Sequence, residues 1–94
     1  MKVLQRIRQL VRNRRYYLSA HAEEEMWADD LERADVEYCL MQGCLEKRLT
    51  HDIRGTRYRI EGLSLDGRLM HVICRFHPAQ DILIITVYVV EAAR

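Results

Sequence analysis

The pattern of apolar and polar positions divides the chain into a helical first half and a stranded second half. Residues 2–14 carry apolar side chains at helical spacing, opposite arginine and glutamine, which predicts an amphipathic helix. Residues 16–18 read as a short extended connection. A second helix is predicted after Ser19, a good N-cap residue, and a third over about residues 35–42, ending at Gly43.

From residue 44 onward the hydrophobic period changes to two, which indicates strands. We predict four of them, near residues 45–51, 56–64, 68–77 and 82–91, separated by turns at 52–55, 66–67 and 78–81. Consecutive strands joined by short turns form an antiparallel meander. We therefore expect an α+β fold, with two to three N-terminal helices packed on a four-stranded antiparallel sheet, as a single domain over residues 1–94.

The turn at Asp66 and Gly67 decides which side chains share a face of the sheet, because a slip of one residue flips a whole strand. A two-residue loop would pair Leu65 with Arg68. It would also bury Arg57, Arg59 and Glu61 in an apolar layer. Burying these three charged residues would cost several kcal/mol. A three-residue loop with Gly67 in the left-handed conformation pairs Ser64 with Arg68 instead. We predict the three-residue loop.

This register assigns the strand residues to two faces. The core face, which the helices should cover, is predicted to hold Tyr58, Ile60, Gly62, Met70, Val72, Cys74, Phe76, Leu83, Ile85, Val87 and Val89. The opposite face should hold Arg57, Arg59, Glu61, His71, Ile73, Arg75, His77, Ile84, Thr86 and Tyr88. Exposed isoleucines (Ile73, Ile82 and Ile84) predict that the first helix, a partner protein or a second copy covers part of the opposite face.

Glu61, His71 and Tyr88 are predicted to lie side by side across three strands of that face. Four further residues follow one or two steps along: Arg59 and Thr86, then Arg57 and Arg75. These groups suit RNA cleavage, in which a base takes the proton of the 2′-hydroxyl, an acid protonates the leaving oxygen and arginines stabilise the phosphate. The other interpretation is a cross-strand network on a solvated sheet, worth about 0.2–1 kcal/mol per pair.

Composition narrows the class of protein. The 94 residues are 49% hydrophobic and 31% charged, as in a folded globular domain. No apolar run approaches the roughly 20 residues of a membrane span. No apolar h-region follows the basic residues at the N-terminus, so we expect no signal peptide. The three cysteines form no CxxC pair, so we expect small buried hydrophobes and a cytoplasmic location. We expect no cofactor. We also expect no metal site, because His71 and His77 are about 20 Å apart along a strand and cannot share an ion.

The net charge of +1 hides an uneven distribution. Residues 1–15 are basic, residues 23–37 are strongly acidic, and the C-terminal half is basic again. A basic region can attract phosphate backbones or an acidic protein partner. Charged faces that complement each other within the fold would explain the first segment equally well.

Three short motifs resemble a bacterial family, domain-of-unknown-function family 4258: residues 19–22 (Ser-Ala-His-Ala), Asp35-Val36 with Leu40 and Gly43, and residues 85–88 (Ile-Thr-Val-Tyr). The resemblance covers nearly everything after residue 15. It implies a RelE-like fold, in the superfamily that joins barnase, EndoU, colicin nucleases and RelE. His21 matches the family's histidine, and Thr86 and Tyr88 match its closing Thr-x-Tyr. Glu24 and Glu25 stand where the family commonly has a basic residue.

The resemblance also implies an activity and partners: a toxin of a type II toxin–antitoxin pair, acting on mRNA or ribosome-associated RNA and neutralised by a small cognate antitoxin. The first hypothesis is thus a metal-independent endoribonuclease with catalytic His21, Glu61, His71 and Tyr88, and phosphate-binding Arg57, Arg59, Arg75 and Thr86. The second is a non-catalytic module that binds protein or RNA. The third is a homodimeric structural protein that pairs through its isoleucine-bearing face.

Overall fold

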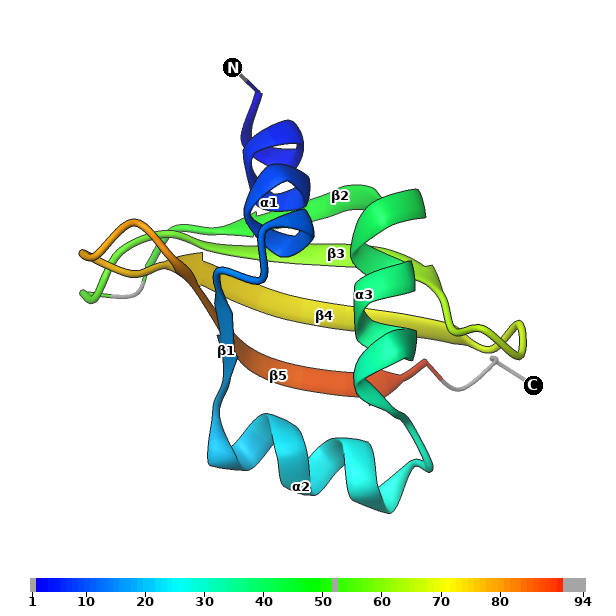
Figure 1. Ribbon diagram of the computed structural model, residues 1–94. Helices are drawn as coiled ribbons and strands as arrows, with labels where there is room; N and C mark the ends of the chain where they lie inside the picture. Colours follow the sequence, from blue (N-terminus) through cyan, green and yellow to red (C-terminus); the bar gives the residue numbers. More distant parts are fainter. Residues whose placement is uncertain (1, 52, 91–94) are drawn as a thin grey trace.

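The computed structural model describes residues 2–51 and 53–90, which form three helices and one five-stranded mixed sheet (Figure 1). The elements follow in the order α1 (Val3–Arg12), β1 (Tyr16–Leu18), α2 (Ala20–Ala28), α3 (Arg33–Gln42), β2 (Cys44–Leu49), β3 (Arg57–Leu63), β4 (Leu69–Phe76) and β5 (Ile82–Val89). The strand order is β1-β5-β4-β3-β2. The predicted α+β class is confirmed, and β2 to β5 form the predicted antiparallel meander.

The prediction of four antiparallel strands is wrong in one respect. Residues 16–18 form a fifth strand, β1, which pairs in parallel with the first part of β5: Tyr16 lies beside Ile82, and Leu18 beside Ile84. A strand of three residues is too short to show an alternating pattern, and its partner lies more than sixty residues away in the chain. Local periodicity therefore gave no sign of this pairing.

The predicted register of the turn between β3 and β4 is confirmed. The backbone N–H of Ser64 donates to the carbonyl of Arg68 at 2.8 Å. Gly67 has a φ of +85°, in the region that a side chain disfavours, so the three-residue loop is formed as expected. Glu61 consequently pairs with His71.

The pairing of β4 with β5 follows the predicted register only as far as Ile73, which lies opposite Thr86. Cys74 then pairs with Ile84, so Ile85 is an extra residue in β5 and forms a β-bulge. The predicted strands contained no bulge. Because of it, the side chains of residues 82–84 point to the opposite face of the sheet from the one predicted.

This bulge corrects the predicted core. Ile82 and Ile84 are completely buried, whereas Leu83 and Ile85 are half-buried and lie outside the packed core. The isoleucine-bearing face predicted for a homodimer therefore loses two of its three members and keeps only Ile73.

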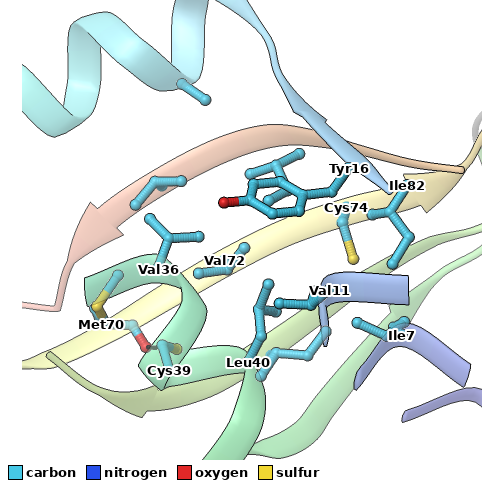
Figure 2. Close-up of a cluster of buried hydrophobic side chains, with 14 of the residues drawn as sticks. Ile7, Val11, Tyr16, Val36, Cys39, Leu40, Met70, Val72, Cys74 and Ile82 are labelled. Carbon is cyan, nitrogen blue, oxygen red and sulfur yellow. Dashed lines mark hydrogen bonds between the residues drawn. The ribbon is translucent and has the colours of Figure 1, made fainter. Parts of the chain in front are cut away.

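The helices occupy two positions around the sheet (Figure 1). α1 and α3 lie on one face, and α2 packs along the edge of β5. The core lies between the sheet, α1 and α3, and Ala22 and Met26 of α2 extend it. Figure 2 shows its centre: Ile7, Val11, Tyr16, Val36, Cys39, Leu40, Met70, Val72, Cys74 and Ile82. None of the helices in the described ranges has the length and apolar character needed to cross a membrane.

Two of the three cysteines are buried, whereas all three were predicted to be. Cys39 and Cys74 are buried in the core as expected, and burial raises the pKa of each thiol to about 12. Cys44 is exposed at the start of β2, so the prediction of a buried residue is wrong there. The change from α3 to β2 at Gly43 brings it to the edge of the sheet.

Candidate functional site

Glu61, His71 and Tyr88 form a hydrogen-bonded row, called the polar row below, across β3, β4 and β5. The Nε2 atom of His71 is 2.8 Å from a carboxylate oxygen of Glu61, and its Nδ1 atom is 2.9 Å from the hydroxyl of Tyr88. The rings of His71 and Tyr88 meet edge to face, with centroids 5.3 Å apart. The three residues alternate along their strands with core residues, so they lie on the face opposite α1 and α3.

The donor and acceptor roles in the row depend on the tautomer of His71, and one tautomer matches an ionised Glu61. An ionised Glu61 only accepts, so the Nε2 atom of His71 carries the proton that it donates to that carboxylate. The Nδ1 atom of the neutral ring is then an acceptor, and the hydroxyl of Tyr88 donates to it. His71 is only 9% exposed, whereas Glu61 and Tyr88 are half-buried at the two ends of the row. Glu61 and Tyr88 are therefore the members that a bound molecule reaches first.

Arg59 lies one step along β3 and is held by a residue that the sequence pattern did not indicate. Its Nε and Nη2 atoms donate to the two carboxylate oxygens of Glu46, at 2.5 and 3.1 Å. This pairing raises the pKa of Arg59, with a smaller contribution from Tyr88, and lowers the pKa of Glu46. The pairing of β2 with β3 shifts register at Glu46, and a bulge of this kind leaves no mark in an alternating pattern.

Of the three other predicted phosphate-binding residues, Thr86 lies level with Arg59, whereas Arg57 and Arg75 lie farther along the strands. Thr86 faces Ile73, which in turn pairs with Arg59, as the register predicted. Arg75 donates from Nη1 to the carbonyl of Arg54 at 3.4 Å. Arg57 lines a pocket of about 340 Å³ with Lys47, Arg48, Leu49, Thr50 and His51. This end of the site is therefore rich in cationic side chains.

His21 is the one predicted catalytic residue that the structure does not bring into the polar row. It lies in the first turn of α2 with its side chain 64% exposed, and its Nε2 atom is 3.2 Å from Glu25. The same carboxylate oxygen of Glu25 accepts a hydrogen bond from the backbone N–H of Val87 at 3.0 Å. Among the contacts of the described residues, none joins His21 to the polar row. Its catalytic role stays a prediction.

The fold and the site define a class: a small α+β protein whose sheet carries a hydrogen-bonded Glu–His–Tyr row on the face that its helices leave uncovered. In a comparison with protein families, the family described as Domain of unknown function (DUF4258) matches residues 18–89. The chain belongs to this family, and the match runs from the last residue of β1 to the last residue of β5. No curated protein and no solved structure matches the chain.

Proposed function

We propose that this protein is a metal-independent endoribonuclease with a RelE-like fold, and that it is the toxin of a type II toxin–antitoxin pair. The observation that carries the proposal is the polar row on the uncovered face of the sheet. A carboxylate, an imidazole and a phenol joined in sequence are a proton-transfer system, and RNA supplies its own nucleophile in the 2′-hydroxyl.

In the proposed reaction, Tyr88 passes its hydroxyl proton to Nδ1 of His71, and Glu61 stabilises the imidazolium that forms. The Tyr88 oxygen takes the proton of the 2′-hydroxyl. The 2′-oxygen then bonds to phosphorus as the bond to the 5′-oxygen breaks, leaving a 2′,3′-cyclic phosphate. Water protonates the leaving 5′-oxygen. The resulting hydroxide then removes the proton that His71 received from Tyr88, and His71 is neutral again. No metal ion takes part in these steps.

The cations around the row suit a polyanionic substrate. Arg59 lies beside Tyr88, and its guanidinium is held by Glu46, so it is positioned to stabilise charge on the reacting phosphate. The basic pocket that includes Lys47 and Arg57 lies beside Arg59, along β2 and the start of β3, where neighbouring phosphates of an RNA strand would bind. A separately encoded small antitoxin would neutralise the activity.

Expression in a bacterial host tests this proposal. The wild-type chain expressed alone should arrest growth and degrade cellular RNA. His71→Ala and Tyr88→Phe should both relieve the arrest at equal protein levels, whereas Tyr17→Phe, which alters an exposed tyrosine outside the row, should not. Full toxicity in both row variants would contradict the assignment of the site.

A second candidate function is a non-catalytic module that binds protein or RNA on the same face. One observation favours it: both ring nitrogens of His71 already have protein partners, and its side chain is only 11% exposed, as in a structural network. This function predicts high yields of protein without an antitoxin and no RNA cleavage. His71→Ala would then lower the free energy of unfolding without removing an activity.

A further inference from the structure

Trp27 is the most exposed aromatic residue among those described. Its side chain lies on α2 and is 87% exposed, although a tryptophan normally buries most of its large apolar surface. It borders a groove of about 370 Å³ between α2 and the start of α3, called the α2–α3 groove below. The groove is lined by Leu18, Glu23, Met26, Trp27, Leu31, Glu32 and Arg33.

The floor of the α2–α3 groove is apolar and rigidly held. Met26 and Leu31 belong to the hydrophobic core, and Leu18 packs against it. The backbone N–H of Leu31 donates to the carbonyl of Met26 at 2.8 Å, which fixes the end of α2 next to the floor. Trp27 therefore stands as one wall of a preformed apolar depression, the arrangement of an anchor site in protein interfaces.

The rim of the groove is acidic. Glu23 and Glu32 line it and are exposed, and Glu24 and Asp30 are exposed on α2 and just after it. Arg33 is the one cation among the described lining residues. Its guanidinium lies over the ring of Tyr16, 5.3 Å from the centroid, and donates to the hydroxyl of Tyr16 at 3.3 Å.

We propose that the α2–α3 groove binds a basic amphipathic segment of a partner protein. An apolar side chain of the partner would pack on Met26 and Leu31 beside Trp27, and its lysines or arginines would face Glu23 and Glu32. The carboxylates select such a partner because opposite charges favour association and like charges oppose it. This inference does not depend on the proposed ribonuclease activity, because the groove lies outside the polar row.

The charge and packing of the chain argue against two other occupants. A nucleic acid would bring phosphates toward the acidic rim, where they would be repelled. A second copy has one basic amphipathic helix to offer, α1, but three of its apolar side chains are already buried in the copy's own core: Ile7, Leu10 and Val11.

Trp27 also makes the proposal measurable, since it is the single tryptophan of the chain. The probe is a synthetic helical peptide with leucine at every third or fourth position and lysine elsewhere. Its control is the same peptide with glutamate in place of lysine. The lysine peptide should shift the Trp27 emission to shorter wavelength in a saturable way, and added salt should weaken the binding. The glutamate peptide should give no shift.

Variants distinguish the groove from the rest of the surface, with binding followed by the anisotropy of a labelled lysine peptide. Trp27→Ala and Glu23→Lys should each weaken binding by about tenfold or more. Tyr38→Ala, which removes an exposed aromatic residue on α3 outside the groove, should leave binding unchanged. Glu32 is left intact because its side chain caps α3.

Several results would overturn the proposal. Equal binding of the two peptides, or no saturable binding of either, would show that the groove does not select a basic segment. A blue shift on raising the concentration of the protein alone would assign the groove to a second copy. Competition by a single-stranded RNA oligonucleotide that Trp27→Ala abolishes would assign it to nucleic acid.

Discussion

A carboxylate oxygen of Glu25 on α2 accepts a hydrogen bond from the backbone N–H of Val87 on β5, at 3.0 Å. Asp29, one turn farther along, accepts from the N–H of Val89 at 3.1 Å. Since β1 pairs only with residues 82–84, the rest of the outer edge of β5 has no neighbouring strand in the described chain. The side chains of Glu25 on α2 and of its C-cap residue Asp29 take the place of that strand and satisfy edge donors that would otherwise be open to pairing.

Glu25→Ala should therefore destabilise the protein by about 1–3 kcal/mol, because it leaves the N–H of Val87 without its acceptor. Urea unfolding measures this change. The matched control is Glu24→Ala, since Glu24 is an exposed neighbour on the same helix and its loss should change stability by about 0.5 kcal/mol or less. Equal effects of the two substitutions would contradict the edge-capping role of Glu25.

The three cysteines should differ sharply in reactivity. In the native protein, iodoacetamide at neutral pH should label Cys44 alone, because Cys39 and Cys74 are buried and the pKa of each thiol is raised to about 12. Mass spectrometry should find one adduct before unfolding and three in denaturant. Native labelling of Cys74 would contradict the packing of β4 against the helices.

The pairing of Glu46 with Arg59 should depend on pH in a defined direction. The pKa of Glu46 is lowered below its usual 4.5, mainly by its hydrogen bond with Arg59. The contribution of the pair is therefore fully present above the pKa of the unfolded chain, and is lost as the pH falls through the lower pKa of the folded protein. The NMR signal of the Arg59 Nε–H should titrate with a midpoint below 4.5. Glu46→Gln should remove that titration, and a midpoint above 4.5 would contradict the pairing.

Much of the sheet could be predicted because its determinants are local. The left-handed glycine at Gly67 and the cost of burying Glu61 with two arginines select one register for β3 and β4, and the structure has that register. The bulges at Glu46 and Ile85 could not be predicted in this way. Each depends on how whole strands fit together, and a single extra residue leaves the alternating pattern almost unchanged.

The same contrast holds for the candidate site. The polar row follows directly from the register, so the amino-acid pattern alone is enough to place its three residues together. Glu46 could not be placed in this way because the bulge brings it to Arg59. The edge-capping role of Glu25 depends on the packing of α2 along β5, which joins residues 62 positions apart. From the sequence, the family resemblance indicates only that Glu25 stands where a basic residue is common.

Tyr88→Phe tests the chemistry of the polar row with little change in volume. The substitution removes the hydroxyl that donates to His71 and keeps the edge-to-face contact between the rings. The rate of RNA cleavage should fall by about 10²–10⁴-fold, the usual contribution of a positioned acid–base group. The free energy of unfolding should change by about 1 kcal/mol. A large loss of stability with unchanged cleavage would instead assign the hydroxyl a structural role.

The proposed function requires the polar row to cleave RNA through the 2′-hydroxyl without a metal ion. Its most direct test is to incubate the purified wild-type protein with a labelled single-stranded RNA in excess EDTA and identify the new ends. We predict cleavage that leaves 2′,3′-cyclic phosphate and 5′-hydroxyl ends, and no cleavage of the same sequence with deoxyribose at the scissile position. Products with 5′-phosphate ends, or cleavage that stops when EDTA is added, would contradict the proposed function.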